Sequence, residues 1–315
     1  MATVTAPAPG RRRRTPLARR EARWAYLFLA PWIVGFLVFY AGPMIASLWL
    51  SFTEYDVINP PEYTGLDNYR ELMSDPAVAR SLGNTVYYAA LHVPLVMLIS
   101  LGLALLLKRV GRLQGFFRTV FYLPVMTPAV AVGILFLLLL NTQDGLINRA
   151  LGLVGIDGPS WTTDPGWVMP GIILMSLWSL GSTVIIYLAA LQNVPRDLYE
   201  AAAIDGAGAW ARFRSVTLPM ISGALFFTLI VNTIASLQMF TEVYTMYFGN
   251  RETQNTFNSD AATFYVIHLF QEAFQFLHMG FASAMAWLLF VIILIITLIQ
   301  VKLSNRFVYY EGEDK

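Results

Sequence analysis

The sequence contains no cysteine, and only three histidines are present among its 315 residues. The lack of cysteine excludes disulfides and thiolate metal ligands, and three scattered histidines leave little material for a metal centre. Charged residues are also scarce, at 13% of the chain against roughly 25% in soluble domains. Together with a hydrophobic content of 57%, this scarcity indicates a membrane protein.

The chain also lacks the marks of an enzyme. It has no Gly-x4-Gly-Lys-Ser/Thr loop for a nucleotide phosphate. A membrane enzyme would need paired carboxylates or a histidine cluster at one depth, and neither pattern is evident. We therefore expect no catalytic residue, no metal, no cofactor bound by this chain, and no nucleic acid as a partner.

Six long apolar runs predict an all-α membrane protein with six transmembrane helices. A run of roughly 20 apolar residues is long enough to cross the hydrocarbon core of a bilayer. The expected spans cover residues 24–50, 84–107, 117–140, 167–191, 220–240 and 279–301. They belong to a membrane domain, 24–305, that lies between a basic disordered tail, 1–23, and a carboxyl-terminal tail, 306–315.

Three segments outside the spans also have a helical pattern. A short helix is expected at 68–73, and an amphipathic helix at the membrane interface is expected at 146–154. Segment 261–277 interleaves Glu272 and Gln275 with apolar side chains. It is too short and too polar for a span, so we expect a surface helix there.

The distribution of basic residues predicts the orientation of the chain in the membrane. Seventeen of the 21 Lys and Arg residues fall on one side of the six-span arrangement, and four fall on the other. The larger group precedes the first span, follows the second and sixth, and occupies the loop 192–218. Because cytoplasmic loops carry the excess of Lys and Arg, both termini and this loop are predicted to be cytoplasmic.

The loop between the fourth and fifth spans is polar and rich in small residues, with the sequence PRDLYEAAAIDGAGAWARFRSVTLP from Pro195 to Pro219. Pro195 suits a first helical position, and Asp197 and Glu200 place negative charge near the positive end of a helix dipole. Gly206 is expected to end this helix. The small side chains predict a smooth face that another protein surface can approach closely.

The order and spacing of residues in this loop resemble the EAA loop of permease subunits from binding-protein-dependent ABC importers, in the carbohydrate branch. The matching residues are Glu200-Ala201-Ala202, Asp205-Gly206-Ala207, Phe213 and Thr217-Leu218-Pro219. Two further blocks are similar to the same family, namely Gly65-Leu66-Asp67-Asn68-Tyr69 and Arg118-Thr119-Val120-Phe121-Tyr122-Leu123-Pro124. The chain departs from the family pattern after Tyr244, where the usual threonine- and glycine-rich turn ending in proline is missing.

This resemblance implies the type I permease fold of ABC importers in a bacterial plasma (inner) membrane. The chain would be one half of a permease pair, a heterodimer, and would translocate a sugar or oligosaccharide delivered by an extracytoplasmic binding protein. Two separate cytoplasmic ATPase subunits would hold ATP and Mg and dock on a coupling helix in the loop. The implied coupling residues are Leu198, Glu200, Ala201, Ala202, Asp205, Gly206, Ala207, Phe213, Leu218 and Pro219.

Polar residues inside the spans are candidates for the substrate path, because such groups are costly against lipid. For each of them, a hydrogen bond between helices is an equally good explanation. The candidates are Asn232, Ser236, Gln238, Glu242, Tyr187, Ser283 and Trp287, with Ser176, Ser179, Ser182, Thr183 and Thr233 beside them. Asn232 and Gln238 are six residues apart and do not share a helical face, so only one of them need line the path. For His92, a packed neutral side chain is favoured over a proton relay.

The alternative function is an ion-coupled secondary transporter of a small polar solute. Such transporters usually need a buried ionisable relay and often repeat one half of the chain in the other. Glu242 lies near a membrane edge, and the first three spans do not visibly repeat in the last three. The importer is therefore the favoured hypothesis.

Overall fold

The computed structural model describes residues 16–249 and 259–307 of the chain. The first elements are α1 (Pro16–Phe36), the π-helical turn η1 (Leu37–Ala41), α2 (Gly42–Leu50), β1 (Thr53–Glu54), β2 (Glu62–Tyr63), α3 (Asp67–Ser74) and α4 (Pro76–Arg109). They are followed by η2 (Gly111–Leu113), α5 (Gln114–Tyr122), η3 (Leu123–Met126), α6 (Ala129–Leu139), α7 (Leu146–Leu153), α8 (Pro165–Ser176), η4 (Leu177–Ser179) and α9 (Gly181–Asn193).

The second half continues the helical fold. Its elements are α10 (Arg196–Ile204), α11 (Ala209–Arg212), η5 (Phe213–Thr217), α12 (Leu218–Met220), α13 (Ser222–Leu237), α14 (Thr241–Phe248), α16 (Ser259–Ala262), α17 (Tyr265–Phe270), η6 (Gln271–Gln275) and α18 (Met279–Phe307). The helices expected at 68–73 and 146–154 correspond to α3 and α7.

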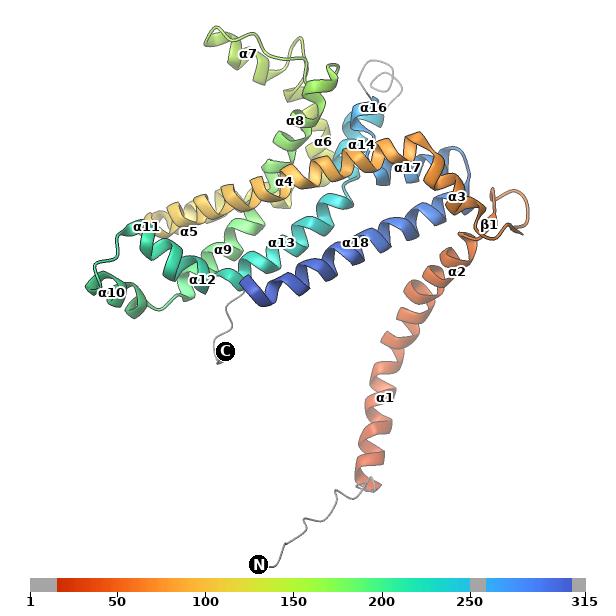
Figure 1. The fold of residues 1–315 in the computed structure, drawn as a ribbon, viewed down its shortest axis with the longest axis horizontal. Helices are drawn as coiled ribbons and strands as arrows, with labels where there is room; N and C mark the ends of the chain where they lie inside the picture. Colours follow the sequence, from red (N-terminus) through yellow and green to blue (C-terminus); the bar gives the residue numbers. More distant parts are fainter. Residues whose placement is uncertain (1–15, 250–258, 308–315) are drawn as a thin grey trace, which may run out of the picture.

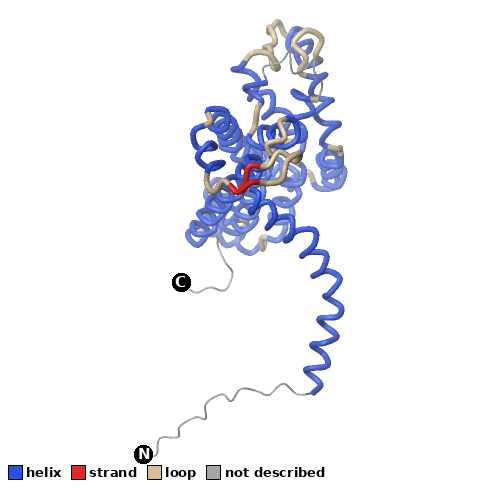
Figure 2. Tube along the Cα trace, turned by 90° about the vertical axis from the view of Figure 1, so that its right-hand side faces the viewer, coloured by secondary structure: helices blue, strands red, loops and turns tan. Residues whose placement is uncertain are grey.

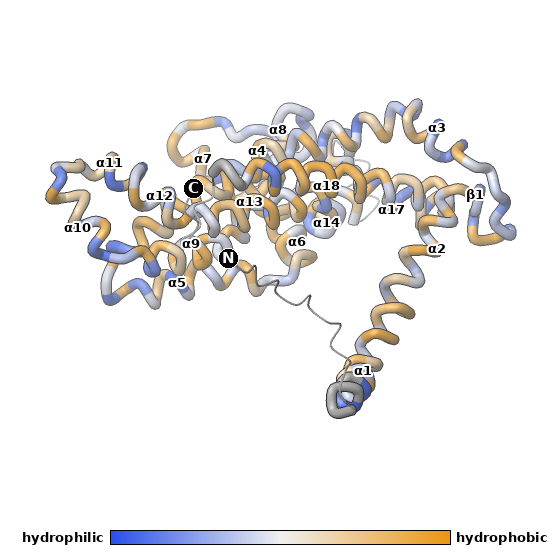
Figure 3. Tube along the Cα trace, turned by 60° about the horizontal axis from the view of Figure 1, so that its bottom comes forward, coloured by the Kyte–Doolittle hydropathy of each residue, from blue (hydrophilic) through white to orange (hydrophobic). Residues whose placement is uncertain are grey.

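Four helices, α4, α9, α13 and α18, lie side by side and form the body of the molecule (Figure 1). Figure 3 shows hydrophobic residues along these helices, whereas hydrophilic residues gather near α10 and α11 at one end and near β1 and α3 at the other. Lipid is as apolar as leucine, so such helices associate through close packing. A Cβ atom on Gly133 of α6 would lie 2.7 Å from the Glu242 carbonyl oxygen, which brings α6 and α14 to backbone contact.

Four helices of the described chain are long and apolar enough to cross a membrane, and two bent pairs bring the number to six if each pair is one span. The stretch expected as the third span is bent by 96° between Met126 and Ala129, and the fourth is bent by 51° around Leu180. Thr127 precedes Pro128 and is extended, because a residue before proline avoids the helical region. Apolar runs alone do not predict these bends.

Several boundaries also differ from those expected. Residues 16–23, expected in the disordered tail, begin α1, while 1–15 lie outside the described residues. The second span begins earlier, at Pro76, because Asp75 caps α4 by accepting a 2.7 Å hydrogen bond from the Ala77 amide. At the carboxyl end α18 continues to Phe307, and 308–315 lie outside the described residues.

Segment 261–277 is not the surface helix that its polar residues suggested. Tyr265, Ile267 and His268 of α17 are buried between α4 and α18. The Tyr265 amide donates to the Thr85 hydroxyl at 2.8 Å, and the Tyr265 hydroxyl donates to the Met285 carbonyl at 2.9 Å. These hydrogen bonds fasten α17 to both neighbouring helices, whereas Gln275, which lies beyond α17, is exposed as expected.

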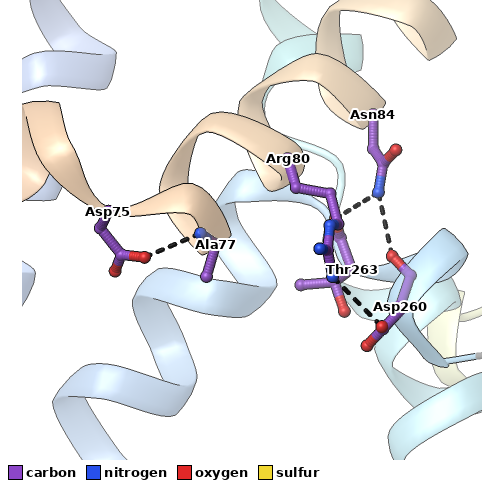
Figure 4. Close-up of polar contacts among 6 residues, drawn as sticks. All are labelled: Asp75, Ala77, Arg80, Asn84, Asp260 and Thr263. Atoms are coloured by element: carbon purple, nitrogen blue, oxygen red, sulfur yellow. Dashed lines mark hydrogen bonds and ion pairs between the residues drawn. The ribbon is translucent and has the colours of Figure 1, made fainter.

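The amino end of α4 holds the segment that follows α14 (Figure 4). Arg80 forms a 3.2 Å ion pair with Asp260, and the Asn84 amide donates to the carbonyl oxygens of Asp260 and Thr263, each at 3.1 Å. These contacts link residues about half the chain apart in sequence. They tie α16 and α17 to the start of α4.

The arm formed by α1, η1 and α2 projects away from the helical body (Figures 1 and 2). None of the residues in its most apolar stretch is buried in this chain. An elbow of residues 51–69 joins it to the body, with β1 and β2 paired antiparallel, Thr53 opposite Tyr63. The Asn68 amide donates to the Ser51 carbonyl at 3.0 Å and to the Thr53 carbonyl at 2.8 Å.

The elbow also rests directly on the start of α18. The Gly280 amide donates to the Tyr55 carbonyl at 3.2 Å, and a Cβ at Gly280 would collide with the Thr53 carbonyl oxygen. Gly65 has a φ of +70°, a conformation that strains other residues. The block Gly65-Leu66-Asp67-Asn68-Tyr69 thus has a structural explanation, since it bends the chain and fastens the arm to the body.

We predict that Asn68→Ala loosens this elbow. Its two acceptors belong to buried residues, and a buried acceptor left without a donor costs about 1–3 kcal/mol. The thermal unfolding midpoint of the purified full-length chain should therefore fall. Asn59→Ala is the matched control, because the Asn59 amide bonds only the exposed Asp56 carboxylate. An equal fall in both variants would show that Asn68 does not hold the elbow.

Candidate functional site

A small polar cavity of about 190 Å³ lies inside the helical body. Its lining combines several hydroxyls with one amide, one imidazole and one carboxylate, and apolar side chains fill the rest. The lining residues are Tyr88, His92 and Val96 of α4, Val132 of α6, Met175 and Ser176 of α8, Ser179 of η4, Ser182 and Thr183 of α9, Asn232, Ala235 and Ser236 of α13, Met239, and Glu242 of α14.

Two helix interruptions border this cavity. Ser179 lies in η4 between α8 and α9, and Met239 lies between α13 and α14. Irregular backbone at membrane depth is tolerated only where protein or a water-filled cavity surrounds it. The helix breaks and the polar side chains therefore lie together, because both need hydrogen-bonding partners that lipid does not provide.

A line of polar contacts crosses one wall of the cavity. The Nδ1 atom of His92 lies 3.0 Å from the Ser236 hydroxyl, which joins α4 to α13. The imidazole stacks on the Tyr88 ring at 5.0 Å, and the Tyr88 hydroxyl donates to Ser176 at 2.8 Å. The His92 Nε2 atom is buried and has no hydrogen-bond partner among the described residues. This wall therefore keeps hydrogen-bonding capacity for a polar ligand or for water.

The structure brings together some of the expected path residues and separates others. Asn232, Ser236 and Glu242 line the cavity, together with Ser176, Ser179, Ser182 and Thr183. The residues outside its lining are Tyr187, Gln238, Ser283, Trp287 and Thr233.

The residues outside the lining have other surroundings. The Tyr187 hydroxyl lies 2.6 Å from that of Thr228 and joins α9 to α13. Gln238 lies at a separate hollow beside Leu289 of α18. Ser283 and Trp287 are on α18, and the Thr233 hydroxyl accepts a hydrogen bond from the Gln300 amide there. Asn232 and Gln238 lie at different hollows, as expected from their spacing. A role in transport stays a prediction for every one of these residues.

Sequence reasoning did not select Tyr88, and it favoured a packed neutral role for His92. A usable signal was present, because Tyr88, His92 and Val96 are spaced four residues apart and share one face of α4. What the sequence does not contain is which face of α4 meets the broken helices. Only packing against α8 and α13 assigns that face to the cavity.

The loop between α9 and α13 presents α10 at one end of the body (Figure 1). Gly206 ends this helix with a φ of +78°, and the amides of Gly206 and Ala207 donate to the carbonyls of Ala203 and Ala202 at 3.1 and 2.9 Å. This is the left-handed termination that glycine favours. One expectation needs correction: Pro195 is the residue before the helix, not its first helical position.

The two sides of α10 have different surroundings. Leu198, Ala201 and Asp205 are exposed, so the expected smooth face is accessible, although Ala202 is half-buried. Tyr199 turns inward, with its hydroxyl 3.0 Å from the Thr217 hydroxyl.

Basic and aromatic side chains hold the loop from inside. Lys108 of α4 donates to the Leu191 carbonyl at 2.8 Å, and its Nζ atom lies 5.1 Å from the centre of the Tyr199 ring. Phe213 is half-buried and stacks on Trp210 with ring centres 5.4 Å apart. Phe213 thus belongs to the anchored part of the loop and not to its exposed face, and Leu218 and Pro219 are half-buried as well.

Comparison with known proteins identifies the family of the chain. Residues 97–309 match the model of a family described as the binding-protein-dependent transport system inner membrane component. The probable ABC transporter permease protein YesP of Bacillus subtilis (strain 168) is 39% identical over 94% of this chain and 95% of its own length. The lactose transport system permease protein LacF of Rhizobium radiobacter is 34% identical over 87% of this chain and 92% of its own.

A solved structure is similar over nearly the whole chain. It is that of a bacterial alginate ABC transporter in complex with an alginate pentasaccharide-bound periplasmic protein. The matching chain has a TM-score of 0.81 and 25% identity, and the match covers 93% of this chain and 98% of that one.

The chain therefore belongs to the family of inner membrane components of binding-protein-dependent transport systems. The expected all-α permease fold and the location in a bacterial inner membrane are confirmed. Family membership also favours the importer over the ion-coupled secondary transporter.

We predict that the cavity is open to aqueous reagents, and the absence of cysteine makes this directly testable. Thiolates form in water, so Asn232→Cys should react with a charged methanethiosulfonate about tenfold faster than a thiol packed in protein. Val184→Cys is the packed comparison on α9, because Val184 is fully buried, does not line the cavity and is close in size to cysteine. Labelling of the full-length chain would be followed by mass spectrometry. Equal rates at the two positions would contradict the assignment of the cavity lining.

Proposed function

We propose that the chain is the non-catalytic membrane-spanning subunit of an ATP-driven importer of a sugar or oligosaccharide. The observation that carries this proposal is the exposed helix α10, which follows α9, the helix that reaches the polar cavity. The Tyr199 hydroxyl anchors α10, and Gly206 ends it. Such a helix suits docking by a separate energy-supplying protein.

The chemistry of the cavity supports a carbohydrate as the transported solute. Hydroxyls such as those of Ser179 and Ser182, and the amide of Asn232, both donate and accept hydrogen bonds, as sugar hydroxyls do. The relatives agree with this class. The names of two of them specify lactose and arabinooligosaccharides, and the similar solved transporter imports alginate.

The energy would come from two cytoplasmic ATPase subunits that hold ATP and Mg. In this proposal their closure pushes on α10, and the push rocks the helices between inward-open and outward-open states. Leu198, Ala201 and Asp205 form the exposed docking face. Glu200 is exposed and adds a charge, and the backbone conformation of Gly206 sets the direction in which the chain leaves the helix.

A second permease subunit would complete the translocation unit, and we propose a heterodimer. The arm α1–η1–α2 supports this, because its long apolar surface extends away from its own helical body (Figure 2). A second permease would provide the packing surface that the body of this chain does not.

The proposed orientation places α10 in the cytoplasm. Lys108, Arg109, Arg196 and Arg212 gather at this end of the body, and an excess of basic residues marks the cytoplasmic side. The carboxyl end of α18 lies at the same end, while β1 and α3 lie at the opposite one (Figure 1). The opposite end, including α17, is then the docking side for the extracytoplasmic binding protein.

We predict that Gly206→Val uncouples the ATPase, whereas Gly206→Asn is tolerated. Nothing lies within 4 Å of a Cβ at this position, so the effect comes only from the positive φ. Valine pays about 1–2 kcal/mol in this conformation, which asparagine adopts more readily. Co-purification of the ATPase subunits should therefore fall about fivefold to thirtyfold for valine alone. Unchanged co-purification of the valine variant would count against the docking role.

Reconstitution of the complete importer in proteoliposomes tests the function itself. With binding protein and a panel of labelled disaccharides and oligosaccharides on one side and ATP on the other, uptake should require ATP. An ionophore that abolishes ion gradients should leave the uptake unchanged. Uptake that persists with ADP and stops with the ionophore would instead establish an ion-coupled transporter.

A further inference from the structure

A second, larger hollow of about 960 Å³ opens beside the loop, between α10–α11 and the junction of α4 with α5. It is a separate site from the polar cavity and shares no lining residue with it. Its walls combine four cationic side chains with apolar and aromatic ones. They include Lys108, Arg109, Arg196, Arg212, Trp210 and Leu105. We call this hollow the basic groove.

The positive charge of the basic groove is not neutralised within the described part of the chain. No carboxylate is among its lining residues, and its arginines take part in none of the ion pairs found in the described residues. Lys108 is occupied by the Leu191 carbonyl and the Tyr199 ring. The Nε atom of Arg212 is buried without a hydrogen-bond partner. A buried guanidinium donor of this kind calls for an anionic acceptor.

Apolar surface adjoins the basic groove. Leu105 and Phe213 are in its wall, and Trp210 is 71% exposed at its edge. Leu113 and Phe116, on either side of the lining residue Gln114, are also exposed. A ligand that satisfies both features carries a phosphate-like anion and a hydrocarbon chain.

We propose that the basic groove binds the phosphate headgroup of an anionic phospholipid from the adjoining leaflet. Basic pockets between membrane helices are a known setting for such headgroups. Arg109, Arg196 and Arg212 would contact the phosphate, while the acyl chains would lie along the exposed apolar side chains at 113 and 116. Binding itself does not depend on the transported solute or on the docking of an ATPase.

The position of the basic groove gives the lipid a regulatory consequence. Arg109 ends α4, whereas Arg196 begins α10 and Arg212 ends α11. A phosphate held between them bridges the helical body and the loop, and so braces α10. This consequence, unlike binding, rests on the proposed coupling role. The exposed face with Leu198 and Ala201 is left free for an ATPase.

The test uses the purified full-length chain in detergent, with bound lipid counted by native mass spectrometry. Phosphatidylglycerol should bind, and phosphatidylcholine, which has no net charge, should bind much more weakly. Arg109→Gln and Arg212→Gln should each weaken phosphatidylglycerol binding about fivefold, the effect of one basic residue near a membrane surface. Arg214→Gln is the matched control, because Arg214 is exposed in the same loop and does not line the basic groove.

Other outcomes overturn the proposal. Equal binding by the groove variants and the Arg214 control would place the lipid elsewhere, and absence of any preference for phosphatidylglycerol would exclude an anionic headgroup site. Equally tight binding of glycerol 3-phosphate would identify a free phosphate ligand instead of a lipid. Loss of the lipid when ATPase subunits are added would show that protein occupies the basic groove. Arg212 is half-buried, so Arg109→Gln, at an exposed position, tests the site where folding of the Arg212 variant fails.

Discussion

The structure depends on one constraint, namely that backbone polar groups in hydrocarbon must find hydrogen-bond partners. Long helices such as α4 and α18 meet it within themselves. Where the helices break, at η4 and between α13 and α14, the chain places the breaks around one polar cavity. The hydroxyls of Ser179 and Ser182 lie there as well. The polar cavity in this fold is therefore built where helical regularity is lost, because the protein there shields both the open backbone and the polar side chains from lipid.

The cavity and the loop are joined by a single short helix. α9 carries Ser182 and Thr183 at the cavity and Leu191 at the basic groove, and its 13 residues span about 20 Å. Lys108 fastens the far end of α9 to α4, while Tyr199 fastens α10 to η5. In the proposed coupling, α9 is the element that would pass a displacement of α10 to side chains at the cavity.

Local signals predicted the loop better than the cavity. The stop at Gly206 and the exposed small residues follow from residues adjacent in sequence, so spacing alone revealed them. The cavity instead depends on which faces of α4, α9 and α13 meet. Asn232 and Ser236 were found because polar groups in spans are rare, but Tyr187 shares that polarity and only joins two helices. Tyr88 was missed because a tyrosine inside a span is equally compatible with packing.

The sequence by itself determined the membrane class, the resemblance to importer permeases and the segregation of basic residues, because these depend on composition, order and spacing. Tertiary structure decided the rest. Pro128 bends a run that hydropathy presents as one span, and contacts with α4 and α18 bury the α17 segment that polarity presents as exposed. Only contacts between distant residues bring Arg109, Arg196 and Arg212 to one groove, since these side chains belong to three separate helices.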